Sequence, residues 1–266
     1  MAHDTWMRAW RPRVPGVREV LHARMTDHAY PAHAHADWAL MLVDEGAVSY
    51  DLGGRARIAD RSRATLLPPG VAHDGRAASR ADGFRKRVAY LDASWLSATL
   101  AGAVVDRPDR DDLVAETRML HRALATPGAE LAAEGMLVEL SGRFAASPGA
   151  AIASVRDPAL ALRLRDLLED RLVDGVPLAE AGRLLGAHPA HLSRSFSAAF
   201  GIPPHRYVTG RRVDLARRLL LGGHPPGEVA AAAGFHDQAH LTRHFRRVLG
   251  TTPARFAGSG ARATRA

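Results

Sequence analysis

The sequence of 266 residues contains 47% hydrophobic and 24% charged residues, which is typical of a globular protein with two domains of ordinary size. It contains no cysteine, which excludes disulfide scaffolds, thiol nucleophiles and cysteine-ligated zinc sites. The net charge of +8 is unevenly placed, because residues 158–258 hold 14 arginines against 8 acidic residues, whereas residues 1–157 hold 20 of each sign. The basic second half predicts contact with a polyanion, although a merely solvated surface would carry the same charge.

No segment of the sequence has the pattern of a membrane span or a secretion signal. There is no run of about 18 apolar residues, and the start, MAHDTWMRAWRPRV, lacks the apolar core of a signal peptide. We therefore expect a cytoplasmic protein without a membrane partner.

Residues 18–100 predict short β-strands joined by turns. The stretch WALMLVDEGAVSYDLGG has two apolar runs divided by a Glu-Gly turn, and ARIADRSRATLLPPG adds two short strands that end at a Pro-Pro-Gly turn. FRKRVAYLD has the composition of a further strand. Strands of this length and spacing predict a β-sandwich or a small barrel.

Residues 94–145 change to a helical period, with apolar positions that recur every three or four residues. The predicted inner face of the first helix comprises Leu113, Thr117, Leu120 and Leu124. The predicted inner face of the second helix comprises Ala133, Leu137, Leu140 and Phe144. These helices could pack on the barrel or on a second copy of themselves, and we expect any homodimer to form through residues 110–145.

The stretch AASPGAAIASVRDP is weakly patterned and contains proline and glycine, which predicts a linker between domains. We therefore expect a first domain over residues 1–145, a linker over 146–157, a helical domain over 158–258 and a tail over 259–266.

The helical domain contains a repeat. HLSRSF begins at His191 and HLTRHF begins at His240, and the match continues at a constant offset of 49 to Tyr207 and Phe256. Two copies are too few for a solenoid. Each copy instead has the parts of a helix-turn-helix, with a helix that ends near a glycine, a short turn and a second helix.

The outer face of each second helix is predicted to contact DNA. In the first module the outward residues are Ala190, Ser193, Arg194 and Ser197. In the second module they are Gln238, Ala239, Thr242, Arg243 and Arg246. Small residues let a helix lie deep in the major groove, arginine can bond guanine O6 and N7, and glutamine can bond adenine N6 and N7. A lone arginine more often only solvates a helix, but its recurrence at one outward position of two modules favours DNA contact.

Four arginines, of which Arg246 is already named above, are predicted to neutralise phosphates beside these helices. They are Arg217, Arg218, Arg246 and Arg247.

Residues 160–258 resemble the C-terminal DNA-binding domain of AraC/XylS-type transcription regulators. The resemblance rests on LSRSFSAAFGIPPHRYV, RRVDLARRLL and EVAAAAGFHDQAHLTRHFRRVLGTTPARF. It implies seven helices, a rigid helix that joins the two modules, and two recognition helices in successive major grooves on one face of the DNA. The resemblance also implies that the outward residues named above contact bases. Ser197 and Arg246 are the exceptions, because they are predicted from helical spacing alone. Leu241 stands where the family more often has phenylalanine, another apolar core residue.

The first half resembles a cupin barrel over residues 18–95. HAHADWALMLVDEG and PPGVAH are similar to the two cupin motifs, and such barrels form the sensor domain of many AraC-type regulators. The implied fold is α+β and multidomain, with a cupin-like β-barrel and following helices before an all-α domain of two helix-turn-helix modules.

The cupin resemblance implies a site near three histidines, but the glutamate of the usual metal set would fall at Ala39 or Leu40 and is missing. Three imidazoles could still hold Zn²⁺ or Fe²⁺. We favour an organic-ligand pocket without metal or cofactor. Its predicted effector-binding residues are His33, His35, Trp38, His73 and Tyr90. Met41 and Tyr50 are predicted to add apolar walls, with Arg85 or Arg87 available for an acidic group.

The sequence therefore predicts a non-enzymatic, sequence-specific regulator of transcription. Its expected partners are double-stranded DNA, a small-molecule effector and, if it activates, RNA polymerase. One alternative is a metal-binding cupin enzyme or metal sensor fused to a DNA-binding module, which the missing glutamate disfavours. A purely architectural DNA binder is disfavoured because it would not need the neutral, well-patterned first half.

Overall fold

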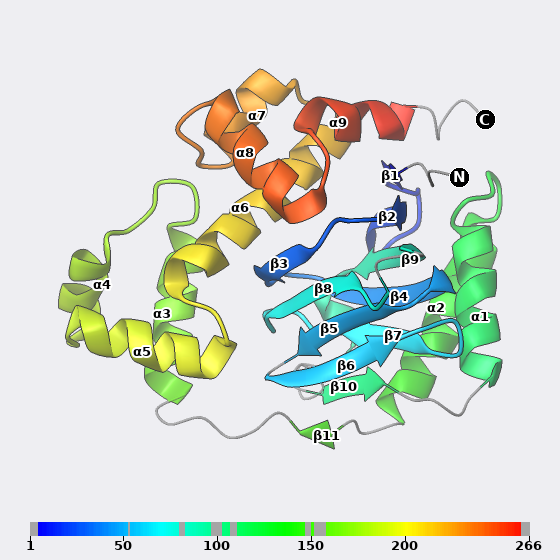
Figure 1. Cartoon of the computed structure of the whole chain (residues 1–266), viewed down its shortest axis with the longest axis horizontal. Coiled ribbons are helices and arrows are strands. Elements are labelled where there is room, and N and C mark those ends of the chain that lie inside the picture. The colour runs from blue at the N-terminus through cyan, green and yellow to red at the C-terminus, as the bar shows by residue number, and fades with distance from the viewer. Residues whose placement is uncertain are drawn as a thin grey trace.

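The computed structural model describes residues 5–52, 54–79, 83–96, 103–106, 111–146, 150–151 and 158–261. Two β-sheets form the first half of the chain (Figure 1). The larger sheet has the order β1-β2-β9-β4-β7-β10-β11 and the smaller has the order β3-β8-β5-β6, with antiparallel pairing throughout the described strands. This arrangement confirms the predicted β-rich first domain.

The strands are short, and β1 lies before the region in which the sequence predicted strands. Their bounds are β1 Trp6–Trp10, β2 Val17–Met25, β3 Tyr30–His33, β4 Trp38–Gly46, β5 Val48–Leu52, β6 Arg55–Ala59, β7 Ala64–Leu67, β8 His73–Ala77, β9 Phe84–Leu91, β10 Ala103–Asp106 and β11 Ala150–Ala151. One 3₁₀ turn, Ala93–Trp95, follows β9.

The period of two along each strand divides the larger sheet into two faces. On β4, Ala39 and Met41 face the space between the sheets, whereas Trp38, Leu40 and Leu42 face the other way. That second face is covered by α1 (Asp111–Ala123) and α2 (Glu130–Ala145) (Figure 1).

The inner faces predicted for these two helices are confirmed. Every predicted residue is buried, with Leu124 just beyond the end of α1. Of the two partners considered for these apolar faces, the barrel is therefore the one that they contact.

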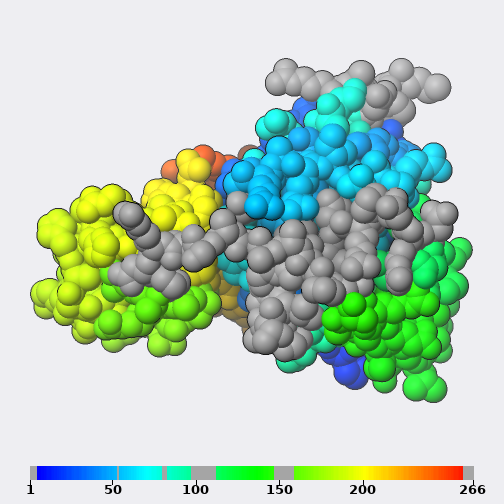
Figure 2. Space-filling view, turned by 90° about the horizontal axis from the view of Figure 1, so that it is seen from below, coloured from blue at the N-terminus to red at the C-terminus, as the bar shows by residue number. Residues whose placement is uncertain are grey.

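Seven helices, α3 to α9, fill the described part of the second half, as the resemblance implied. Their bounds are α3 Pro158–Asp170, α4 Leu178–Leu185, α5 Pro189–Phe200, α6 Pro204–Leu221, α7 Pro226–Ala232, α8 Gln238–Leu249 and α9 Pro253–Ala261. The first module is α4 with α5, the second is α7 with α8, and α6 joins them. Figures 1 and 2 show the first module projecting from one end of the molecule, with α1 and α2 at the opposite end.

The two modules end their second helices in the same way. Gly201 after α5 and Gly250 after α8 have φ angles of 74° and 72°, the left-handed conformation that favours glycine. The repeat in sequence is therefore also a repeat of backbone conformation.

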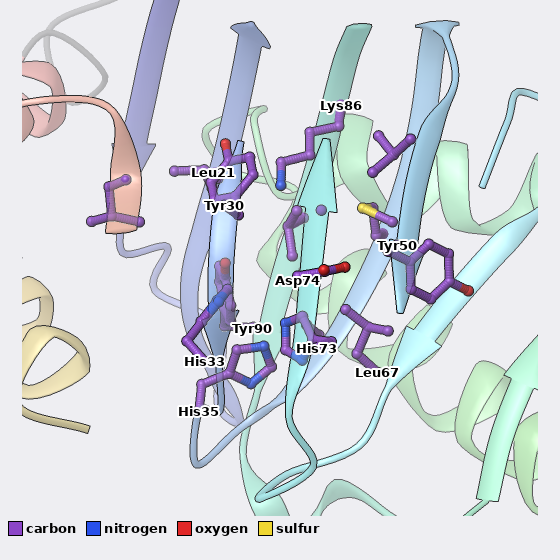
Figure 3. A pocket seen from close by; sticks show the side chains of 16 residues that line it. Leu21, Tyr30, His33, His35, Tyr50, Leu67, His73, Asp74, Lys86 and Tyr90 are labelled. Atoms are coloured by element: carbon purple, nitrogen blue, oxygen red, sulfur yellow. The ribbon is translucent and has the colours of Figure 1, made fainter. Parts of the chain in front are cut away.

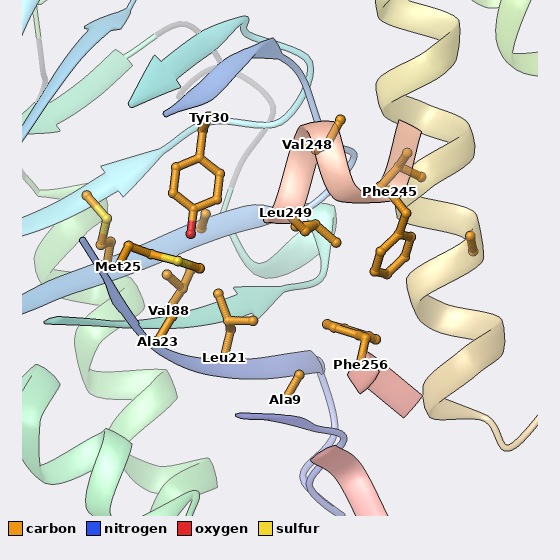
Figure 4. Close-up of a cluster of buried hydrophobic side chains, with 14 of the residues drawn as sticks. Ala9, Leu21, Ala23, Met25, Tyr30, Val88, Phe245, Val248, Leu249 and Phe256 are labelled. Carbon is orange, nitrogen blue, oxygen red and sulfur yellow. The ribbon is translucent and has the colours of Figure 1, made fainter. Parts of the chain in front are cut away.

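The second module packs on the barrel through a shared apolar core. Leu21 and Met25 of β2 belong to one buried cluster with Phe245, Leu249 and Phe256 of the second half (Figure 4). The two halves are thus not separated by solvent, which the sequence did not predict.

The predicted linker and tail are only partly described. Within the linker, Ala150–Ala151 pairs with β10, and residues 147–149 and 152–157 lie outside the described residues. The tail was predicted to begin at residue 259, but α9 continues to Ala261, and the Ser259 hydroxyl accepts a hydrogen bond from the Ala9 amide at 3.1 Å. In the part of the chain that the structure describes, no helix is long and apolar enough to cross a membrane.

Candidate nucleic-acid interface and ligand cavity

The outer face of α8 is open and basic. A shallow groove on this helix is lined by Gln238, Ala239, Thr242, Arg243 and Arg246, the five residues predicted to face DNA. The opposite side of the helix is buried in the core. The Asp237 carboxylate accepts a hydrogen bond from the His240 amide at 2.6 Å and so caps the helix start. The helix itself contains no acidic residue.

The outer face of α5 has the same arrangement. Ala190 and Arg194 are exposed, and Ser193 and Ser197 are half-buried beside them. At the helix start His188 Nδ1 accepts a hydrogen bond from the Ala190 amide at 3.2 Å. At 1.5 Å per residue the 18-residue α6 between the modules is about 27 Å long, somewhat less than the length of about 34 Å of one turn of DNA.

Arg217 is not available to DNA, which corrects its predicted role as a phosphate contact. Arg217 is only 4% exposed, and its Nη2 donates a hydrogen bond to Glu19 Oε1 of β2 at 2.6 Å. The three remaining arginines of that prediction differ in exposure, since Arg218 is half-buried whereas Arg246 and Arg247 are exposed. The sequence pattern did not indicate that Arg217 is buried, because its partner Glu19 lies in the other half of the chain.

The ion pair continues along α6 toward the first module. Asp214 lies between two arginines, with its oxygens 3.3 Å from Arg217 Nη1 and 3.1 Å from Arg211 Nη1. Arg211 then makes two bonds to Glu169 of α3, at 2.6 and 2.9 Å, and Glu169 also accepts from the Tyr207 hydroxyl at 2.7 Å. A continuous chain of charged side chains therefore links β2 of the barrel to α6 and α3 of the helical domain.

A small cavity lies between the two sheets (Figure 3). Its volume is about 40 Å³, and its lining includes His33, His35, His73 and Tyr90, four of the five predicted effector-binding residues. Met41 and Tyr50 line it as predicted. Leu249, the last residue of α8, also belongs to its wall.

Each of the three histidine rings is held in place by a hydrogen bond to a backbone carbonyl. The Nδ1 atoms of His33, His35 and His73 lie 2.8, 2.9 and 3.1 Å from the carbonyl oxygens of residues 31, 37 and 71. A carbonyl only accepts, so each Nδ1 donates and the Nε2 of the neutral ring keeps its lone pair.

Burial keeps the histidine rings neutral. It lowers the pKa of His33 and lowers the pKa values of His35 and His73 well below their usual range. The ring centroid of His73 lies 4.7 Å from those of both other rings. Within the described ranges, no group of three or more histidine, aspartate or glutamate side chains is placed to hold a metal ion.

Trp38 does not line the cavity, which corrects its predicted role. It is 1% exposed on the opposite face of β4, in the core beneath α1 and α2, and its indole N–H donates to the Ala93 carbonyl at 3.2 Å. Arg85 and Arg87 also point out of the cavity, where their guanidinium groups pair with the carboxylates of Glu45 and Asp44.

Lys86 is the cation of the cavity, and the sequence analysis missed it. It lies between Arg85 and Arg87 on β9, so it faces inward with Tyr90, four residues later. Two signals in the sequence could have identified Lys86. It lies four residues before Tyr90, and it is the only lysine of the chain. Burial lowers the pKa of Lys86 to about 7, and the positive charge of Arg217 contributes to the shift.

Comparison with known proteins adds the family. A model described as the AraC-like ligand binding domain matches residues 15–141, and one described as a helix-turn-helix domain matches residues 182–259. The HTH-type regulator YbfI of Bacillus subtilis is 30% identical over 135 residues, 50% of this chain and 49% of that protein. The probable regulator LumQ of Photobacterium leiognathi is 31% identical over 90 residues, 34% of this chain and 36% of that protein. The match thus spans between about a third and a half of these relatives.

A crystal structure of ToxT from Vibrio cholerae has the same fold over almost the whole chain. It aligns with a TM-score of 0.61 and 10% identity, covering 96% of this chain and 97% of that one. The ligand-binding match lies over the sheets with the cavity, and the helix-turn-helix match lies over the helices with the basic outer faces. On these grounds the chain belongs to the AraC family of transcription regulators.

Proposed function

We propose that the protein binds specific DNA sequences through α5 and α8 and regulates transcription in response to a small molecule in the cavity. Residues 1–145 would form the effector domain and residues 158–258 the DNA-binding domain. The observation that carries the proposal is the position of Leu249, which lines the cavity and ends the recognition helix of the second module. A ligand that moves Leu249 would therefore act directly on a DNA-reading helix.

A second contact links the cavity to the DNA-binding half. The ring of Tyr90 lines the cavity, and its centroid lies 4.3 Å from the guanidinium carbon of Arg217 on α6. A ligand that shifts Tyr90 would disturb the buried ion chain along α6. A solved ToxT structure is described with a bound unsaturated fatty acid, which supports modulation by a small molecule.

The likeness to named regulators supports a non-enzymatic role. The curated relatives that match this chain are named as transcription regulators. The protein would act in the cytoplasm, where its DNA lies, and RNA polymerase would be a further partner if it activates transcription.

A homodimer is supported by an apolar stripe on the outer face of α2. Leu131 and Val138 are 82% and 72% exposed, and Gly135 and Gly142 occupy the next positions of the same stripe. Positions 131, 135, 138 and 142 follow the 4-3-4 spacing of a coiled-coil seam. A Cβ added to either glycine would meet nothing within 4 Å, so a second helix could approach closely.

Arg243→Ala tests the DNA-binding proposal. Removing a guanidinium that reads a base should weaken binding by roughly 1–3 kcal/mol and relax the preference at one base position. Fluorescence anisotropy on DNA from the control region of its own gene, and on single-base variants, measures both effects. Arg247→Ala is the matched comparison, because Arg247 is exposed on the same helix but does not line the groove. As a predicted phosphate contact, its loss should weaken binding about equally on all sequences. An equal loss on all sequences for Arg243→Ala would assign it to phosphate.

A further inference from the structure

We infer that the cavity takes a small organic monoacid that also carries a hydroxyl group. The carboxylate would lie at Lys86, and the hydroxyl would lie at His33, His35 and His73. Figure 3 shows Lys86 and Tyr30 toward one end of the cavity and the three histidines at the other. The inference names the ligand class of the proposed effector site, and its regulatory consequence rests on the proposed function.

The end at Lys86 suits an anion. Lys86 is only 9% exposed and lines the cavity, and its Nζ lies 3.9 Å from the centroid of the Tyr30 ring. Among the residues that the structure describes, no carboxylate forms an ion pair with it. A buried ammonium group without a counter-ion is costly, and a ligand carboxylate would supply one.

Tyr30 supplies a second donor beside Lys86. Its hydroxyl is buried and has no hydrogen-bond partner within the described part of the chain. Because Nζ lies over the same ring, one anionic group at this end could accept from both donors.

The histidine end requires a donor. Each ring has its Nδ1 hydrogen committed to a backbone carbonyl, so the group that it offers to a ligand is the Nε2 lone pair. A hydroxyl group can donate to that lone pair, whereas a carboxylate or a hydrocarbon end cannot. The wall between the two ends includes Met41 and Val88, which suits a short apolar spacer.

Asp74 limits the ligand to one negative charge. This carboxylate also lines the cavity, and its Oδ1 accepts a hydrogen bond from the Asp51 amide at 2.6 Å. A second carboxylate on the ligand would meet the charge of Asp74 in a poorly solvated space. A dicarboxylate should therefore bind less well than a hydroxy acid of equal length.

Four probes of equal length test the inference on the full chain. We would titrate 4-hydroxybutanoate, butanoate, 1,4-butanediol and succinate by calorimetry, and repeat the comparison with the six-carbon series. The hydroxy acid should bind best in at least one series. The diol should bind about tenfold or more weakly, since a hydrogen bond to a charged group contributes about 1.5–3 kcal/mol, and the plain acid about 2- to 10-fold more weakly, since a hydrogen bond between neutral groups contributes about 0.5–1.5 kcal/mol. A diol that binds equally well would overturn the acid end, an equal plain acid would overturn the hydroxyl end, and no binding in either series would overturn the whole inference.

Two substitutions assign the acid end to its residues. Lys86→Met should weaken binding of the hydroxy acid by about 10- to 100-fold and leave the diol unchanged, because only the charged contact is lost. Arg85→Met, on the same strand but facing out, should change neither. Tyr30→Phe should cause a smaller loss of binding that is also selective for the hydroxy acid. It replaces Lys86→Met as the test if that variant does not fold. Equal loss for acid and diol in Lys86→Met would contradict the assignment.

DNA binding measured with and without the hydroxy acid separates the two proposals. Acid binding without any change in DNA affinity would leave the ligand class standing and contradict the effector role. DNA binding without acid binding would leave the DNA-binding proposal standing and overturn the ligand class.

Discussion

Lys86 shows how one side chain can oppose folding while it serves a site. Its ammonium group is buried against the Tyr30 ring, and its pKa falls from 10.5 to about 7. Such a residue destabilises the empty protein, and a methionine of similar length would fit the same apolar surroundings. Natural proteins often retain a strained or unpaired group at a functional site.

Lys86→Met should stabilise the protein most strongly at and below pH 7. Below about pH 7 the lysine is charged in both states, so the folded state bears the full cost of the buried charge. Between about 7 and 10.5 the folded state loses its proton first, so the stability of the unmodified protein rises with pH and the advantage of the variant shrinks. Urea denaturation of both proteins at about pH 7, about pH 8 and about pH 9.5 measures the difference. A constant difference would show that Lys86 is not the group that titrates.

The recognition helices α5 and α8 end at equivalent glycines whose surroundings differ. The equivalent glycines Gly201 and Gly250 both adopt a positive φ. A Cβ on Gly250 would lie 3.0 Å from the His28 ring, whereas the nearest atom to a Cβ on Gly201 is the Ala72 Cβ at 3.7 Å. The His28 ring also lies 3.2 Å from the Val248 carbonyl, so only the second module ends against the barrel through a close contact of this kind.

Gly250→Ala should therefore cost more than Gly201→Ala. Both variants acquire an unfavourable φ, which costs about 1–3 kcal/mol. Only Gly250→Ala must also move the His28 ring or the end of α8. Chemical denaturation of the two variants gives the comparison, and equal losses would mean that His28 moves aside freely.

The whole molecule is held together by an apolar core and a buried ion chain that both cross from the barrel to the helices. Glu19 and Arg217, which form the crossing ion pair, are 198 positions apart in the sequence and have side chains only 5% exposed. A buried charge that loses its partner is far costlier than an exposed one.

Glu19→Gln should lower the free energy of unfolding by about 3–5 kcal/mol, because Arg217 stays buried without a full counter-charge. The double variant Glu19→Gln with Arg217→Met should recover part of that loss. Asp92→Asn, which breaks the exposed pair with Arg18, is the control and should cost less than about 1 kcal/mol. A loss for Glu19→Gln no larger than that of the control would show that the pair is not a main link between the halves.

Val138→Glu should convert the proposed homodimer into a monomer. In an antiparallel pair of α2 helices centred on Val138, each copy would place this side chain against its own counterpart, so two carboxylates would meet. Sedimentation of the full chain measures the change, with Ala125→Glu, exposed beyond α1, as the matched control. A monomeric unmodified chain would contradict the α2 interface.

The sequence by itself determined the local structure of this protein. Helix periods, caps and turn residues act over a few positions, so the two modules, their outer faces and the inner faces of α1 and α2 followed from the residues alone. The resemblance to the two cupin motifs, rather than a local period, led to the prediction that three of the histidines and Tyr90 share one site.

Only the tertiary structure decided which of these side chains reach that site and what lies behind it. Trp38 lies outside the predicted pocket and Lys86, for which the sequence predicted no role, lines it, because the faces of β4 and β9 were assigned by burial against α1 and α2, elements far along the chain. Arg217 became a buried ion partner because β2 supplies Glu19. Leu249 entered the cavity wall because α8 packs on the barrel. These outcomes depend on contacts between distant segments, which the period of a single helix or strand does not contain.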